Sequence, residues 1–280
     1  MNRDFLFSEK LKSDEQKSTP DCRYDTCQDC GVCDFSEIQN IFSDPDLSPT
    51  PAEIKTPAAR INEKVYRLSF AKTGRARFLS HLELARALTR ALRRSSLSLS
   101  YSAGFHPHPK ISFATATSVG MASLEEYLDV TAAEYPGDLS HLKNKINAAL
   151  PAGLEVTNIR LLSYVARDLA RSLRGFAYDL TLPADMKEAQ LNNIKDNIEG
   201  FLASSSFPIS RQSKWKTVNR DIRPYVEALT FNAGERKITT LLRHAQTGST
   251  RPIDIIGHVL GCSATQAQQI QVIKTRTILE

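Results

Sequence analysis

The chain has 280 residues, of which 41% are hydrophobic and 24% are charged, values typical of a globular protein and not of a disordered or fibrous one. No apolar run approaches the ~20 residues that a membrane-spanning helix needs, and the first residues contain neither a long apolar stretch nor a small-residue cleavage site. The composition therefore predicts a cytoplasmic protein without a membrane partner.

The charge is unevenly distributed along the chain. Residues 1–60 contain 7 Lys/Arg and 12 Asp/Glu, a net charge of −5, whereas the remainder contains 29 and 19, a net charge of +10. A basic body behind an acidic leader favours a polyanionic partner, with ordinary surface charge as the alternative interpretation.

The first motif in the chain is a cysteine cluster. Four of the five cysteines form the pattern Cys22-x4-Cys27-x2-Cys30-x2-Cys33. Clustered cysteines in a cytosolic protein are more typical of a metal or redox site than of disulfides. We predict that residues 1–33 form a knuckle in which these four thiolates bind zinc or an iron–sulfur cluster. Free thiols on a flexible tail are the alternative.

Residues 34–63 have the composition of a linker. Prolines, serines and acidic residues are mixed there without a helical or strand period. We expect this segment to be flexible and to separate the knuckle from a folded body.

The first half of the body, residues 64–165, alternates between strand and helix patterns. The sequence predicts strands over 65–71, 97–101, 110–117, 126–132 and 154–162, and helices over 81–94 and 138–150. Ser80, followed three residues later by Glu83, is a capping-box signature at the start of the first helix. Apart from one additional strand, this order is ferredoxin-like.

The second half, residues 170–280, repeats the pattern more loosely. It predicts strands over 176–182, 214–218, 225–231, 237–243 and 270–278, and helices over 184–203, 253–260 and 263–269, with Pro252 at the first position of the second helix. The predicted fold is therefore α+β, with two tandem ferredoxin-like units after the cysteine-rich knuckle and the flexible linker.

The predicted helix over 81–94 separates leucines from arginines. At 100° per residue, Leu84, Leu88 and Leu92 share one side, and four arginines occupy the other: Arg86, Arg90, Arg93 and Arg94. Arginine matches phosphate oxygens bidentately, which favours a nucleic-acid surface. A solvated face, or pairing with acidic residues of another subunit, is the alternative.

A loop rich in proline and histidine follows this helix. Phe105 could stack on a base, and His106 and His108 could contact phosphate or act as acid and base. A rigid connector is the alternative. The full predicted nucleic-acid-binding set is Lys72, Arg75, Arg77, Arg86, Arg90, Arg93, Arg94, Phe105, His106, His108 and Lys110.

Three blocks of the body resemble a known family. They are residues 68–84 (LSFAKTGRARFLSHLEL), 101–113 (YSAGFHPHPKISF) and 126–129 (EYLD). Together they resemble the radical-SAM-associated domain of unknown function, also called the radical-SAM-linked protein family, over about residues 64–245. Residues 19–33 resemble the C-terminal tail of cobalamin-binding-type radical SAM proteins.

The resemblance implies a radical SAM enzyme as partner, in cis or in trans, and also a ribonuclease E/G-type protein. We therefore expect an RNA-binding accessory module, for tRNA or rRNA, in a radical SAM-linked RNA modification or processing system. The chain lacks the Cys-x3-Cys-x2-Cys triad of radical SAM enzymes, so we expect no catalysis by this chain alone.

Two alternatives remain open from the sequence. One is a ribonuclease or RNA-modifying enzyme that uses His81, His106 or His108 as acid and base. The other is a protein-docking domain for the radical SAM enzyme. The sequence assigns no catalytic residue.

Overall fold

A computed structural model describes residues 1–22, 24–34, 37–38, 63–133, 137–162, 168–213, 216–245 and 247–280. The chain divides into two compact units, residues 1–59 and residues 60–280. Most of the predicted linker over 34–63, and the start of the strand predicted over 214–218, lie outside the described residues.

In the described residues of the first unit, helix α1 (Arg3–Asp14) is followed by the cysteine segment. The Asn2 side chain caps the helix by accepting a hydrogen bond from the backbone N–H of Asp4 at 3.0 Å. The helix buries none of its residues. Its stability therefore depends on local contacts, such as the Lys12–Glu9 ion pair at 2.8 Å.

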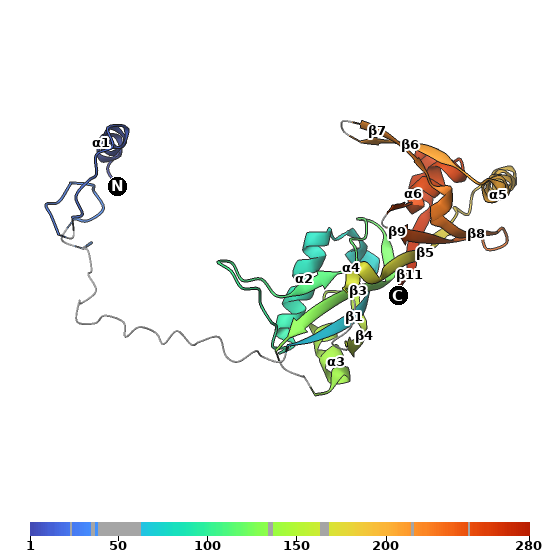
Figure 1. The fold of residues 1–280 in the computed structure, drawn as a ribbon, viewed down its shortest axis with the longest axis horizontal. Helices are drawn as coiled ribbons and strands as arrows, with labels where there is room; N and C mark the ends of the chain where they lie inside the picture. The colour runs from blue at the N-terminus through green and yellow to red at the C-terminus, as the bar shows by residue number, and fades with distance from the viewer. Residues whose placement is uncertain are drawn as a thin grey trace. The chain divides into compact units, whose positions relative to one another are not determined.

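The second unit is built on a nine-stranded mixed sheet in the order β10-β9-β5-β11-β3-β1-β4, with β2 paired to β3 and β8 paired to β9 (Figure 1). Its strands are β1 (Lys64–Lys72), β2 (Ile111–Phe113), β3 (Ala122–Ala132), β4 (Leu154–Leu161), β5 (Leu173–Thr181), β8 (Val226–Asn232), β9 (Lys237–Ala245), β10 (Gly248–Ser249) and β11 (Gln271–Leu279). A separate hairpin joins β6 (Pro208–Ser213) to β7 (Lys216–Asp221). Strand β11 runs parallel to β3 and joins the two halves of the sheet.

In the first half the strands lie in the order β4-β1-β3-β2, and each neighbouring pair is antiparallel. Helices α2 (His81–Arg94) and α3 (Leu139–Ala149) contribute to the same apolar cluster as β1, so they cover one face of this half. Leu68 and Phe70 of β1 are buried in that cluster together with Leu88 of α2. A short 3-10 helix, η2 (Gly74–Phe78), connects β1 to α2.

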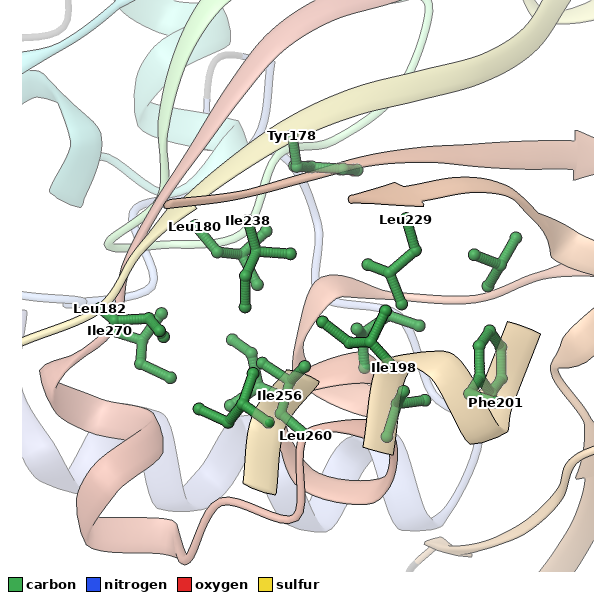
Figure 2. Close-up of a cluster of buried hydrophobic side chains, with 14 of the residues drawn as sticks. Tyr178, Leu180, Leu182, Ile198, Phe201, Leu229, Ile238, Ile256, Leu260 and Ile270 are labelled. Carbon is green, nitrogen blue, oxygen red and sulfur yellow. The ribbon is translucent and has the colours of Figure 1, made fainter. Parts of the chain in front are cut away.

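In the second half the strands lie in the order β11-β5-β9-β8, again with antiparallel neighbours. The helical elements are α4 (Leu169–Ser172), η3 (Arg223–Tyr225), α5 (Glu188–Ala203), α6 (Pro252–Asp254), the π-helical η4 (Ile255–Val259) and α7 (Ala264–Gln269). Figure 2 shows Leu180 and Ile238 from the sheet on one side of a second cluster, and Ile256 and Leu260 on the other. Each half therefore has its own hydrophobic cluster.

The α+β class is confirmed, and several predicted elements need correction. The strand expected over 97–101 is reduced to isolated bridges at Leu99 and Tyr101, and the strand expected over 110–117 to β2. Pro109, which bridges Tyr101, has no N–H to donate, so pairing between residue 101 and this segment stays a single bridge. The helix expected over 184–203 begins at Glu188, where the Gln190 side chain accepts a bond from Lys187 N at 2.9 Å. No helix in the described ranges is long and apolar enough to span a membrane.

Candidate nucleic-acid interface

Helix α2 carries the arginine row on its exposed side. Ser80 and Glu83 form the capping box that starts the helix, with the Ser80 N–H donating to the Glu83 carboxylate at 2.8 Å. Leu84, Leu88 and Leu92 are buried against the sheet. The four arginines, Arg86, Arg90, Arg93 and Arg94, are all exposed. The acidic residue of this helix is already bonded at the cap, so the outer face of α2 is strongly basic.

The loop between α2 and β2 is a narrow hairpin whose base is held by backbone bonds. Ser102 N donates to the His108 carbonyl at 2.8 Å, and Tyr101 bridges Pro109. Gly104 has a φ of 156°, which side chains with a Cβ rarely adopt. Figure 1 shows this hairpin in green, projecting beside α2. The geometry holds the tip of the loop away from the body.

Phe105 lies at that tip with its whole side chain in solvent, at 103% relative exposure. His106 and His108 are exposed as well. A fully exposed phenylalanine is unusual because burial of its ring is worth ~1.5–3 kcal/mol. Such a ring is available to stack on a planar partner.

The arginine row and the hairpin meet at Arg93. Its guanidinium carbon lies 5.8 Å from the centre of the Tyr101 ring at the base of the hairpin, a cation–π arrangement. The C-terminal end of α2 and the hairpin are therefore neighbours, a juxtaposition that the sequence pattern could not establish.

Other members of the predicted set are placed differently. Lys72 is completely buried and donates to the Leu79 carbonyl at 3.0 Å, and burial lowers the pKa of its ammonium group. Lys110 is paired with Glu63 at 2.9 Å. Arg75 is exposed, whereas Arg77 is half-buried with its guanidinium 4.7 Å from the Phe78 ring centre. The accessible basic surface therefore contains fewer residues than the nucleic-acid-binding set predicted from the sequence.

His81 is separated from the other two candidate histidines. It is half-buried at the start of α2, with its ring 5.1 Å from that of Phe113 in an edge-on contact. Its Nδ1 is buried and makes no hydrogen bond within the described part of the chain. The structure therefore gives it no hydrogen-bonded partner among those residues to orient it as an acid or base.

In the first unit the four cysteines lie close enough to influence one another. Burial, followed by the proximity of Cys30, Cys22 and Cys27, raises the pKa of the Cys33 thiol. The backbone N–H of Asp29 donates to the sulfur of Cys27 at 3.4 Å.

Four neighbouring thiols, of which Cys27 accepts a backbone N–H bond, suit the chemistry of zinc or an iron–sulfur cluster. However, no group of three or more His, Cys, Asp or Glu side chains among the described residues is arranged to hold a metal ion. Metal binding by this segment therefore stays a prediction.

Comparison with known protein families gives a match within the second unit. Residues 65–252, more than half of the chain, match the family described as "Uncharacterized protein conserved in bacteria (DUF2344)". The chain belongs to this family. The DUF2344 region contains α2 and the hairpin, whereas the cysteine segment and β11 lie outside it.

Comparison with curated proteins gives no match to this DUF2344 chain. Among solved structures, it matches the "Crystal Structure of an Unknown Protein from Galdieria sulphuraria" at 9% identity. That match covers 78% of this chain and 99% of the other, with a TM-score of 0.26, a value that supports no inference about fold or function.

Sequence reasoning missed a second basic group on the opposite face of the sheet. Arg160 on β4 and Arg276 on β11 line the same pocket although they are distant in sequence. The alternation of β4 could have indicated that Asn158 and Arg160 face outward. Nothing local to residue 276 indicated that β11 would lie beside β3.

Proposed function

We propose that this protein is an RNA-binding accessory module of a radical SAM-linked RNA modification or processing system. One observation supports the proposal above the others. The exposed arginine row of α2 adjoins a projecting hairpin with a solvent-exposed phenylalanine, through the contact between Arg93 and Tyr101.

The arginine row of α2 and the hairpin that carries Phe105 would make different contacts with RNA. Four arginines on one helix face can neutralise phosphates without regard to sequence. The Phe105 ring can stack on an unpaired base, a contact worth ~1–3 kcal/mol. Stacking on unpaired bases is typical of proteins that recognise single-stranded RNA or loops. We therefore propose tRNA or rRNA with an exposed loop as the ligand.

The finer description of the fold belongs to this proposal. In each half the central strands lie in the order fourth, first, third, second when β6, β7 and β10 are set aside. This order supports the interpretation as two tandem ferredoxin-like units. The partners, a radical SAM enzyme and a ribonuclease E/G-type protein, rest on the resemblance of the three sequence blocks.

A metal centre in the cysteine segment is also part of the proposal. Cys22, Cys27, Cys30 and Cys33 would hold zinc, which would fix the segment, or an iron–sulfur cluster, which would exchange electrons with a partner. The Asp29 N–H, which donates to the Cys27 sulfur at 3.4 Å, would lower the charge density on that ligand.

The alternative enzymatic function has no comparable support. His106 is exposed beside Phe105 at the tip of the hairpin, His108 is exposed near its base, and His81 packs against Phe113. No ion pair or side-chain hydrogen bond joins any of these three rings to a carboxylate within the described residues. The docking function remains the alternative if RNA binding fails.

The test is an RNA-binding isotherm measured across a salt series. Labelled tRNA and rRNA fragments are titrated with wild-type protein and with the Arg90→Gln/Arg94→Gln variant by fluorescence anisotropy. Four phosphate contacts predict a slope of log K against log salt of about −3 to −4. The variant should bind more weakly, with a slope smaller in magnitude by about 1 for each arginine–phosphate pair that the substitutions remove.

A matched control removes the same charge elsewhere. Lys145→Gln/Lys195→Gln eliminates two exposed lysines on α3 and α5 and should leave the slope nearly unchanged. If the arginine variant keeps the affinity and the slope of the wild type, the RNA surface is wrong and the docking function takes its place.

A further inference from the structure

The sheet face opposite α2 and α3 contains a pocket. Strand alternation turns Arg67 and Ser69 of β1 away from Leu68 and Phe70, which lie under the helices. These polar side chains, with residues of β3, β4 and β11, line a pocket of about 690 Å³. This volume lies within the ~300–1,000 Å³ typical of small-molecule sites.

The polar groups at the floor of the pocket are paired with one another. Arg67 donates to both carboxylate oxygens of Asp129, at 2.7 and 2.8 Å. The two side chains are only 4% and 11% exposed. Ser69 shares a 2.8 Å hydrogen bond with the Thr157 hydroxyl. Because these groups satisfy one another, the floor offers a fixed polar surface and not an unpaired charge.

The two carboxylates in the lining are also engaged. Glu125 accepts bonds from the Tyr127 hydroxyl at 2.8 Å and from the Thr277 N–H at 3.0 Å. Glu280 is paired with Arg174. Neither carboxylate therefore forms an ion pair with the two remaining arginines of the pocket.

Those two arginines are exposed. Arg160 lies directly opposite Arg67 in the β1–β4 register, and Arg276 lies on β11. Within the described part of the chain, no carboxylate forms an ion pair with either guanidinium. Outside its internal ion pairs, the lining thus sets two guanidinium groups against one carboxylate, that of Glu125, whose hydrogen bonds come from neutral donors.

The strand order fixes how far apart those points are. Strands β4, β1, β3 and β11 are consecutive in the sheet, so the two arginines are three strand spacings apart across the sheet, about 14 Å. They are also offset along the strands, because Arg160 lies level with Asp129 whereas Lys274 pairs with Ser123. Tyr127 and Asn158 lie between and beside them in the same lining. The Tyr127 hydroxyl stays protonated because burial and Glu125 raise its pKa to about 12.

We propose that this pocket binds a phosphate-bearing small molecule of nucleotide size. Arg160 or Arg276 holds the phosphate, and the planar body of the ligand lies over Tyr127 and within reach of the Asn158 amide. Arginine supplies the bidentate match to phosphate, an aromatic ring supplies a stacking surface, and an amide can pair with a base edge. This site is on the opposite face from the arginine row of α2 and does not depend on the proposed RNA surface.

Titration calorimetry with the four 5′-mononucleotides and with inorganic phosphate tests the site. We expect saturable binding of at least one mononucleotide, tighter than that of inorganic phosphate. Arg160→Gln and Arg276→Gln should together weaken it about 10-fold or more, because a hydrogen bond to a charged group is worth ~1.5–3 kcal/mol. Lys145→Gln, a control on the helix-covered side, should bind like the wild type.

The RNA titration distinguishes the proposed RNA surface on α2 from the proposed pocket. It also shows whether the pocket binds the phosphate of a free mononucleotide or that of an RNA backbone. The Arg160→Gln/Arg276→Gln variant should keep the wild-type RNA affinity and salt slope, and the α2 variant should keep mononucleotide binding. The pocket proposal is wrong if no mononucleotide binds at millimolar concentration to protein whose circular dichroism is native. It is equally wrong if binding survives both substitutions, or if these substitutions flatten the RNA salt slope.

Discussion

A buried charge cluster at the junction of β3 and β11 gives a prediction about stability. The Glu126 carboxylate lies 2.7 Å from the Lys274 ammonium, and the two side chains are only 3% and 2% exposed. Thr117 donates a hydrogen bond to the same carboxylate. Lys72, which is also completely buried, lies near enough for Glu126 to raise its pKa against the stronger effect of burial.

The Glu126→Gln substitution leaves two buried ammonium groups without their shared counter-charge. Removing one partner of a buried ion pair costs ~3–5 kcal/mol, because the other charge remains desolvated and uncompensated. This is a large part of the ~5–15 kcal/mol that stabilises a typical domain. The matched control is Glu199→Gln, which breaks the exposed Lys195–Glu199 pair at 4.0 Å and should cost no more than ~0.5 kcal/mol.

Urea unfolding at pH 7, followed by far-ultraviolet circular dichroism, measures both losses. The midpoint of Glu126→Gln should fall well below that of wild type, and the midpoint of Glu199→Gln should not. The Glu126→Leu/Lys274→Met variant should recover part of the loss, because it removes both charges together. Equal midpoints for Glu126→Gln and Glu199→Gln would show that the cluster does not hold the two halves of the sheet together.

Three further predictions follow from other parts of the chain. Burial lowers the pKa of Lys72 below its ordinary value of 10.5, so the unfolded chain binds the proton more tightly and stability should rise as pH rises towards that value. The midpoint of wild type relative to that of Lys72→Met should therefore rise when urea unfolding is compared from pH 7 to pH 10. Anaerobically purified protein should contain about one zinc or iron centre per chain by elemental analysis. The Cys27→Ser/Cys30→Ser variant should lose this metal. A metal content well below one per chain in wild type, unchanged in the variant, would contradict metal binding by the cysteines. Phe105→Ala should weaken RNA binding by ~1–3 kcal/mol in anisotropy titrations while leaving the salt slope and the melting temperature unchanged. A change of slope would instead indicate that the substitution disturbs phosphate binding.

Local signals predicted helix α2 correctly. The Ser80–Glu83 capping box and the leucine spacing are both encoded within fifteen residues, and the structure begins and ends the helix at His81 and Arg94. The hairpin after it was only partly predictable. Gly104 and the prolines indicated a loop, but no pattern within the loop indicated that Tyr101 would meet Arg93.

Long-range pairing produced the features that the sequence did not predict. Lys72 resembles a surface lysine at the end of a strand, but it is buried near Glu126 and near Lys274, which β11 brings in from the end of the chain. The same pairing brings Arg276 into the pocket that contains Arg160. Neighbours of this kind are set by the register of distant strands, which local patterns do not encode.

The most direct test of the central claim is ultraviolet crosslinking of bound tRNA and rRNA fragments, followed by peptide mapping of the crosslinked sites. We expect crosslinks at Phe105 and its neighbours in the hairpin, and in peptides from α2, with loss of both in the Arg90→Gln/Arg94→Gln variant. Crosslinks that leave out the hairpin and α2, and fall instead in the second half or the sheet pocket, would contradict the proposed RNA surface.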